Sequence, residues 1–320
     1  MSFSSDVKDE ITRLETGAPC CMLAELVAVM GASGTVSLLG GGRMGVYVET
    51  EHAPTARRLL LLLRAAFGVQ PALRATRRVQ LGGRNSYRLS LAGDEAMRVL
   101  TACGVLHRDA EGRFFIRPNI PKQALAKKCC RKAFLRGAFM AGGSISNPEK
   151  EYHLEFVLAD ERFASLLCGV LMKFRLHVKK VRRKGAIVVY LKEAEHIVTL
   201  LNLLGAYGAQ CDLENIRIHK DIRNNVNRVV NCDSANLGKT IDAAGRQVMA
   251  IERIARQMGL ARLPEPLREI AQARLEHQEA SLQELGALLQ PPVGKSGVNH
   301  RLRRLVAIAD ALSKQKGDMP

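Results

Sequence analysis

An internal repeat constrains this chain more than any other feature of its sequence. Residues 20–37 (CCMLAELVAVMGASGTVS) and 129–146 (CCRKAFLRGAFMAGGSIS) are identical at seven of eighteen positions, at an offset of 109. Self-similarity of this kind indicates two copies of one structural unit. In each copy a run of small and apolar residues predicts a helix that ends at Gly34 or Gly143, before residues that favour β-structure.

The segments that follow the two motifs also match. The first half continues with a predicted strand at 46–50, a helix at 53–67, strands at 69–81 and 85–91, and a helix at 94–103. The second continues with a strand at 152–158, a helix at 161–174, strands at 176–183 and 186–191, and a helix at 193–204. Each half is therefore expected to fold as α-β-β-α-β-β-α, and the two halves to pack as a pseudo-twofold pair.

Small residues in the two motif helices indicate how this pair packs. They should let the helices approach closely, since they carry little or no side chain between the backbones. These residues are Ala28, Gly31, Ala32, Ser33, Gly137, Ala138, Ala141, Gly142 and Gly143.

Positive charge is concentrated in stretches without acids. The chain has 48 Lys and Arg against 31 Asp and Glu, a net charge of +17, which favours polyanionic partners. A single acid-free stretch is often just a solvated surface, but several such stretches in one chain favour a nucleic-acid-binding surface. The basic residues of corresponding strands are expected to contact the phosphates of a DNA duplex. They are Arg74, Arg77, Arg78, Lys179, Lys180, Arg182 and Arg183.

Helical patterns replace strand patterns after Tyr207. Residues 212–259 predict one or two long helices, and a second one would begin near 231–234. Gly259, Pro264 and Pro266 then interrupt the chain, and a further helix is expected over 267–280.

A helix-turn-helix unit is predicted between residues 281 and 313. Ser281 and Glu284 form a capping-box pattern that opens a short helix, which Pro291, Pro292 and Gly294 end. A second helix starts near Ser296. Its buried stripe is expected to consist of Val298, Leu302, Leu305, Ala309 and Leu312.

The other face of this second helix is basic, which is typical of a recognition helix in the DNA major groove. The alternative is a helical hairpin with a basic solvent-facing side. The lack of any acid between Glu284 and Asp310 argues against that alternative, because solvated faces usually mix both signs. The residues expected to contact DNA are Ser281, Lys295, Ser296, Asn299, His300, Arg301, Arg303 and Arg304.

Eight cysteines without a C-x-x-C pair indicate reduced, packed thiols rather than a disulfide framework. The vicinal pairs Cys20–Cys21 and Cys129–Cys130 could meet across the pseudo-twofold axis and bind a metal or sense oxidation. Vicinal spacing is wrong for a structural zinc site, so packing is expected instead. We therefore predict no metal and no cofactor.

Several other patterns exclude function classes. Gly40, Gly42 and Gly45 spell G-x-G-x-x-G, but a strand follows where a nucleotide site needs a helix, so a hairpin turn is expected. No histidine stands in an arrangement for nucleophilic catalysis. Apolar runs such as Leu59–Leu63 are far shorter than the roughly 20 residues of a membrane helix, and the N-terminus lacks a signal-peptide pattern. A cytoplasmic protein is expected.

The repeated segments LVAVMGASG (26–34) and LRGAFMAGG (135–143) resemble the LAGLIDADG motif of homing endonucleases. In those nucleases the penultimate motif residue is an acid that binds the catalytic metal, whereas this chain has Ser33 and Gly142 there. Gly31 and Met140 replace the earlier motif acids. The resemblance implies a module that binds DNA without a catalytic residue, because neither position offers a hard anionic ligand.

The whole chain resembles the WhiA family, on the segments MSFSSDVKDE, CCRKAFLRGAFMAGGSISNPEKEYHLE, NRVVNCDSANLGKTIDAAGRQ and SLQELGALLQPPVGKSGVNHRLRRL. The resemblance implies an α+β fold, with a pseudo-twofold LAGLIDADG-like double module followed by an all-α helix-turn-helix domain. The expected divisions are 1–106 and 127–210 for the halves, 107–126 for their linker, 211–262 for a helical connector and 263–320 for the helix-turn-helix domain.

The same resemblance implies a nucleoid-associated transcription regulator of sporulation, cell division and chromosome segregation. Double-stranded DNA is the expected partner, together with other transcription factors, and no membrane or small-molecule substrate is expected. Two other readings stay open. One is a residual nuclease that uses Glu25, Glu155 or Asp160. The other is an RNA-binding or architectural protein, against which the 4% aromatic content without Trp argues mildly.

Overall fold

The computed structural model describes residues 2–40, 43–78, 84–117 and 119–317. The chain divides into two compact units, Met1–His219 and Lys220–Pro320. Among the described residues, no helix has both the length and the apolarity needed to cross a membrane.

The first half of the repeat starts after α1 (Phe3–Thr12). Its elements are α2 (Pro19–Ser33), β1 (Thr35–Leu38), β2 (Met44–Thr50), α3 (Ala53–Phe67), β3 (Ala72–Arg78), β4 (Arg84–Ala92) and α4 (Gly93–Ala102). The segment between the halves contains β5 (Leu106–Arg108), β6 (Phe114–Ile116) and the short 3-10 helix η2 (Lys122–Leu125). The predicted linker, 107–126, therefore contains regular secondary structure.

The second half has the same element order. It consists of α5 (Lys128–Gly142), β7 (Gly143–Ile145), β8 (Leu154–Leu158), α6 (Glu161–Met172), β9 (Lys179–Arg183), β10 (Ala186–Leu191) and α7 (Ala194–Leu204). The two four-stranded sheets have the equivalent orders β1-β2-β4-β3 and β7-β8-β10-β9. The predicted α-β-β-α-β-β-α pattern is therefore confirmed in both halves.

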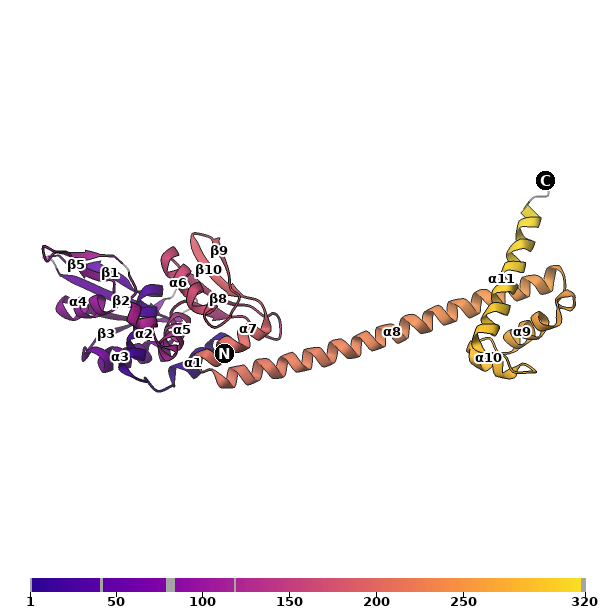
Figure 1. The fold of residues 1–320 in the computed structure, drawn as a ribbon, viewed down its shortest axis with the longest axis horizontal. Coiled ribbons are helices and arrows are strands. Elements are labelled where there is room, and N and C mark those ends of the chain that lie inside the picture. The colour runs from indigo at the N-terminus through magenta and orange to yellow at the C-terminus, as the bar shows by residue number, and fades with distance from the viewer. Residues whose placement is uncertain (1, 41–42, 79–83, 118, 318–320) are drawn as a thin grey trace. The chain divides into compact units, whose positions relative to one another are not determined.

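Helices α2 and α5 lie side by side at the centre of the first unit (Figure 1). A Cβ atom on Gly137 would lie 2.2 Å from the Glu25 carbonyl oxygen and 3.0 Å from Ala28 Cβ. Gly137 and Ala28 occupy the same position of the repeat, so the helices cross where both halves carry a small residue. The predicted close approach is confirmed.

The two halves share one continuous hydrophobic core. Residues of α2, α5 and both sheets belong to a single cluster, in which Leu26, Phe134 and Phe156 are almost completely buried. Neither half buries its apolar face alone, and this explains why the motif helices are apolar on more than one side.

A buried ion network crosses the interface between the halves. Glu25 on α2 has no exposed surface, and its Oε1 accepts a hydrogen bond from Arg58 Nε of α3 at 2.9 Å. Its Oε2 lies 3.3 Å from Nη1 of Arg136, which extends from α5 in the other half. Burial lowers the pKa of Arg136, and the Glu25 carboxylate opposes that shift.

Helix α8 (Tyr207–Gln257) begins in the first unit, where the Glu10 carboxylate accepts hydrogen bonds from the amides of Gly208 (2.7 Å) and Ala209 (3.1 Å). It continues without a break through residues 231–234, so the single-helix alternative is the correct one. It is followed by η3 (Leu260–Arg262), α9 (Glu265–Glu276), α10 (Leu282–Leu288) and α11 (Lys295–Gly317).

The second unit has its own core, built by α9, α10, α11 and the last turns of α8. Ile251 and Ile254 of α8 are fully buried there against Ile270, Leu285 and Leu302. The end of α8 is thus part of the helix-turn-helix domain and not only a connector to it.

Replacing Gly137 by Ala should separate α2 from α5, because the new Cβ meets the backbone of Glu25 rather than a flexible side chain. We expect the free energy of unfolding to fall by about 1–3 kcal/mol, as overpacked cores do. Urea denaturation of the full chain, followed by circular dichroism, measures this.

Gly169→Ala on α6 is the matched control. A Cβ there meets no atom within 4 Å, so this variant should gain roughly 0.5–1 kcal/mol from helix propensity. Equal stability of the two variants would contradict the close approach of α2 and α5 as a packing constraint.

Candidate nucleic-acid interface

A reciprocal cap fixes the start of α10. The Ser281 hydroxyl accepts a hydrogen bond from the Glu284 amide at 3.3 Å, and the Glu284 carboxylate accepts one from the Ser281 amide at 2.7 Å. The pKa of Glu284 is lowered mainly by the hydrogen bond from the Ser281 backbone, and further by the hydrogen bond with the Ser281 side chain. The predicted capping box is confirmed, and the Ser281 side chain is engaged in it.

The turn between α10 and α11 is tight because Gly286 lacks a side chain. A Cβ on Gly286 would lie 2.0 Å from the Val293 carbonyl oxygen, and the Val293 amide donates to the Gly286 carbonyl at 2.9 Å. Gly286 is not among the residues predicted from the sequence. The only signal for it is an isolated glycine inside a helical pattern, which costs helix propensity and here has a packing reason.

Arg274 of α9 holds the connection that precedes α10. The residue is buried, and its Nη1 donates to the carbonyl oxygens of Gln278 (3.1 Å) and Ala280 (2.7 Å). Burial lowers the pKa of this guanidinium. The burial of Arg274 could not be predicted from the sequence, because no residue near it in the chain indicates which helices cover it.

The predicted apolar stripe of α11 faces the core of the second unit. Val298, Leu302, Leu305 and Ala309 are buried, and Leu312 packs against them with part of its surface exposed. At the end of α10, the C-cap residue Leu289 is buried in the same core, whereas Leu288 is exposed. The stripe fixes the rotation of α11, because each successive residue turns by about 100° around the axis.

This rotation divides the predicted DNA-contacting residues of α11 into two groups. The residues on the outer face are exposed, whereas Asn299 and Arg301 lie on its two flanks and are half-buried. Lys295 is also exposed, at the first turn of the helix. We call the following four residues the outer face of α11: Ser296, His300, Arg303 and Arg304.

Asn299 borders a groove of about 500 Å³ inside the second unit. Lys239 and Gln247 of α8 line one wall of the groove, and Ser281 and Lys295 line the other. Asn299 is thus placed beside α8, at the rim of the exposed surface rather than at its centre.

The basic strands of the first unit occupy equivalent places. Strand β3 is an outer strand of one sheet, and β9 is the equivalent outer strand of the other. Because side chains alternate along a strand, each basic run is split between two faces of its sheet. One face packs on helices, and we call the opposite one the open face.

In the second half, Lys179 and Arg183 lie on the open face and are exposed. Lys180 and Arg182 point to the helical side, where Lys180 Nζ forms an ion pair with Glu161 at the start of α6 and Arg182 Nη2 lies 3.8 Å from the same carboxylate. The predicted set of four basic residues therefore forms two pairs with different surroundings.

The first half shows the same division. Arg74 is the cross-strand partner of Arg88, which places both on the open face. Arg77, the partner of Asn85, lies on the face that packs on helices. Arg88 is paired with Glu49 at 2.6 Å and stacks over Tyr47 at 4.5 Å from the ring centre. The side chain of Arg78 lies outside the described residues.

The C-terminal ends of the two motif helices, α2 and α5, carry no acid. Ser33 ends α2 and donates its hydroxyl to the Val29 carbonyl at 3.2 Å. Gly142 ends α5, and a Cβ there would lie 2.7 Å from the Val157 carbonyl oxygen. A side chain at residue 142 would therefore need the neighbouring strand to shift.

The carboxylates considered for a residual nuclease are engaged elsewhere. Glu25 is buried between two arginines. Glu155 Oε2 lies 3.1 Å from His153 Nε2, and Asp160 caps α6 by accepting a hydrogen bond from the Phe163 amide at 2.7 Å. Over the described parts of the chain, neither potential group of metal ligands includes a residue at the C-terminal ends of α2 or α5.

The glycine-rich segment after β1 is a hairpin, as predicted. Strands β1 and β2 pair in antiparallel register from Thr35 opposite Tyr47 to Leu38 opposite Met44. Gly40 adopts a φ of 80°, which a side chain disfavours. Gly42 lies outside the described residues.

A doubled LAGLIDADG-like module with one core, joined to a helix-turn-helix domain, is the class that these features define. Family models match in the same order: the WhiA N-terminal LAGLIDADG-like domain over residues 19–106, the WhiA LAGLIDADG-like domain over 131–223 and the WhiA C-terminal HTH domain over 226–309. The chain belongs to the WhiA family, and both the whole-chain resemblance and the predicted fold class are confirmed.

Individual relatives agree over nearly the full length. A "Probable cell division protein WhiA" of Heliobacterium modesticaldum is 46% identical and covers 99% of this chain and 98% of its own. A protein with that name from Desulfitobacterium hafniense is 47% identical and covers 98% of both chains. The crystal structure of full-length DUF199/WhiA from Thermatoga maritima matches with a TM-score of 0.59 at 26% identity, over 97% of this chain and 99% of that chain.

Proposed function

We propose that this protein is a sequence-specific regulator of transcription that binds double-stranded DNA and does not cut it. The observation that carries the proposal is the outer face of α11, where Arg303 and Arg304 stand exposed on a helix whose other side is locked into a core. A rigid helix presenting planar guanidinium groups is suited to the major groove.

Each part of the second unit has a role in this reading. Arginine can donate two hydrogen bonds to O6 and N7 of guanine, so Arg303 and Arg304 supply base readout, with His300 and Ser296 beside them. Lys295 at the first turn contacts phosphate. Asn299 and Arg301, on the flanks of α11, contact the walls of the DNA major groove. The cap made by Ser281 and Glu284 orients α10 across the DNA backbone.

The first unit adds sequence-independent contacts. Lys179 and Arg183 on one open face, and Arg74 on the other, are placed on equivalent outer strands. A duplex that runs across both sheets would meet these cations in succession, and phosphate contacts of this kind raise affinity without reading sequence.

We infer a lack of cleavage because the C-terminal ends of α2 and α5 offer no ligand for a catalytic metal ion. A hydrolytic Mg²⁺ site needs carboxylate oxygens in octahedral geometry, and Ser33 and Gly142 supply none. The carboxylate of Glu25 is neutralised by Arg58 and Arg136 in the core, where it has no access to solvent.

The biological setting rests on the relatives. Proteins that match this chain over 97–99% of its length are named "Probable cell division protein WhiA". We extend this to a nucleoid-associated role in cell division, chromosome segregation and sporulation, exercised together with other transcription factors and without a small-molecule substrate.

Substituting both Arg303 and Arg304 by Ala should weaken binding to the specific site and reduce the preference for it. Loss of a bidentate base contact costs about 1–3 kcal/mol, so a drop of at least tenfold in affinity is expected. Gel shifts with genomic target fragments and competitor DNA measure both quantities.

Arg268→Ala on α9 is the control, since Arg268 lies outside α11 and its Nη2 is 3.8 Å from the Glu265 carboxylate. Asn299→Ala with Arg301→Ala tests the flanks. If neither double variant changes affinity or preference, the recognition-helix assignment is wrong. Duplex RNA that competes as well as specific DNA would favour the RNA-binding alternative.

The open-face pair Lys179→Ala with Arg183→Ala should weaken binding to all DNA sequences alike. If each residue contacts one phosphate, the slope of log affinity against log salt should fall by about 1.8, at about 0.9 per phosphate. Lys180→Ala with Arg182→Ala removes the same charge from the helical side, where Glu161 partners it, and should change the slope less. The opposite ranking would contradict DNA binding on the open face.

Supercoiled DNA incubated with the protein and Mg²⁺ or Mn²⁺ should remain uncut, with an active LAGLIDADG nuclease as the positive control. Agarose electrophoresis detects nicking and linearisation. Site-dependent cleavage that is lost in Glu155→Gln or Asp160→Asn would establish the residual-nuclease alternative and overturn this part of the proposal.

A further inference from the structure

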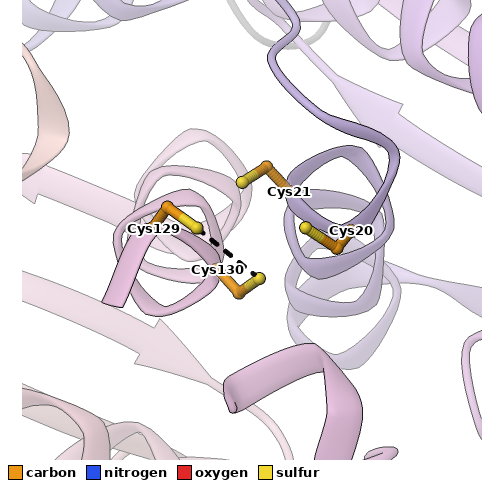
Figure 2. A group of neighbouring side chains, drawn as sticks. All are labelled: Cys20, Cys21, Cys129 and Cys130. Carbon is orange, nitrogen blue, oxygen red and sulfur yellow. Dashed lines mark hydrogen bonds between the residues drawn. The ribbon is translucent and has the colours of Figure 1, made fainter. Parts of the chain in front are cut away.

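Four cysteines from the two halves of the repeat meet at one place. Cys20 and Cys21 lie in the first turn of α2, and Cys129 and Cys130 lie in the first turn of α5 (Figure 2). The two pairs occupy identical positions of the repeat, so the pseudo-twofold relation that brings the helices together also brings the pairs together.

All four sulfur atoms lie within 4.8 Å of one another. Figure 2 shows the four side chains around the space between the two helix starts, with Cys129 Sγ 4.0 Å from Cys130 Sγ. A tetrahedral zinc ion with Zn–S bonds of about 2.3 Å requires sulfur separations of about 3.8 Å. Only small side-chain adjustments separate the observed cluster from this geometry.

From this geometry we propose that Cys20, Cys21, Cys129 and Cys130 form a structural Zn²⁺ site that joins the starts of α2 and α5. The spacing within each vicinal pair, taken alone, favours packing over metal binding. Tertiary structure supplies the second pair, and four thiolates are a complete ligand set for zinc.

The surroundings suit the charge of such a centre. Four thiolates and one Zn²⁺ carry a net charge of −2, and the positive ends of two helix dipoles point at the cluster. Neither helix has an acid in its first turn.

Access and enclosure are both present. Cys130 is buried, Cys20 and Cys21 are half-buried, and Cys129 is exposed. An ion can therefore enter past Cys129 and then be held by ligands that the core keeps in place. The bound ion would fix the helix pair at one end, while Gly137 and Ala28 fix the crossing further along.

The test uses full-length protein purified under reducing conditions without chelator, followed by elemental analysis and titration with Zn²⁺. We expect about one Zn²⁺ per chain. Cys129→Ser should weaken binding by more than about 100-fold, because loss of a direct ligand costs more than the 10–100-fold typical of residues behind the ligands. Cys211→Ser, at an exposed cysteine outside the cluster, is the matched control and should bind like the original protein.

Two further measurements do not depend on the folding of a variant. Co²⁺ added to metal-free protein should give the thiolate charge-transfer and tetrahedral d–d absorption bands. Zn²⁺ should also protect Cys20, Cys21 and Cys129 from alkylation, while the exposed Cys211 and Cys232 react at an unchanged rate.

Three results would overturn the proposal. The first is failure of the reduced protein to bind Zn²⁺ or Co²⁺. The second is binding that persists in Cys129→Ser and disappears when His177 and His196, which form a separate group with Glu193, are replaced by Ala. The third is a disulfide between Cys21 and Cys129 in place of metal.

Discussion

The contact between α2 and α5 is the constraint on which the first unit depends. Gly137 lets the α5 backbone meet the α2 backbone at Glu25, and the Glu25 carboxylate then binds Arg58 from its own half and Arg136 from the other. A carboxylate without solvent access costs several kcal/mol unless it is paired, so both arginines must be in place for the halves to close. The repeat is asymmetric here, since the residue equivalent to Glu25 is the buried Phe134.

This packing role of the motif helices does not require the acids that the LAGLIDADG motif of nucleases carries. It depends on the small residues Ala28 and Gly137, which let the helix backbones meet. At Gly142 the strand that carries Val157 occupies the space of a side chain. In the proposed function, DNA is bound by the exposed cations of the outer sheet strands and of α11.

Much of the second unit follows from local sequence. The stripe of Val298, Leu302 and Leu305 and the cap at Ser281 depend on residues a few positions apart, and both form as predicted. The roles of Gly286 and Arg274 could not be predicted in the same way. One depends on how closely a loop returns to its helix, and the other on three carbonyl groups that only the folded turn brings together.

The sequence by itself determined the repeat, the order of the elements, the positive charge and the helix-turn-helix, because each is a matter of composition or short-range periodicity. Only the tertiary structure decided which cations share a surface. The alternation of side chains sends Lys179 and Arg183 to one face of β9 and Lys180 and Arg182 to Glu161 on the other. It also decided that cysteines 109 residues apart in the chain form one cluster, since a pseudo-twofold axis is a relation in space that neither pair reveals alone.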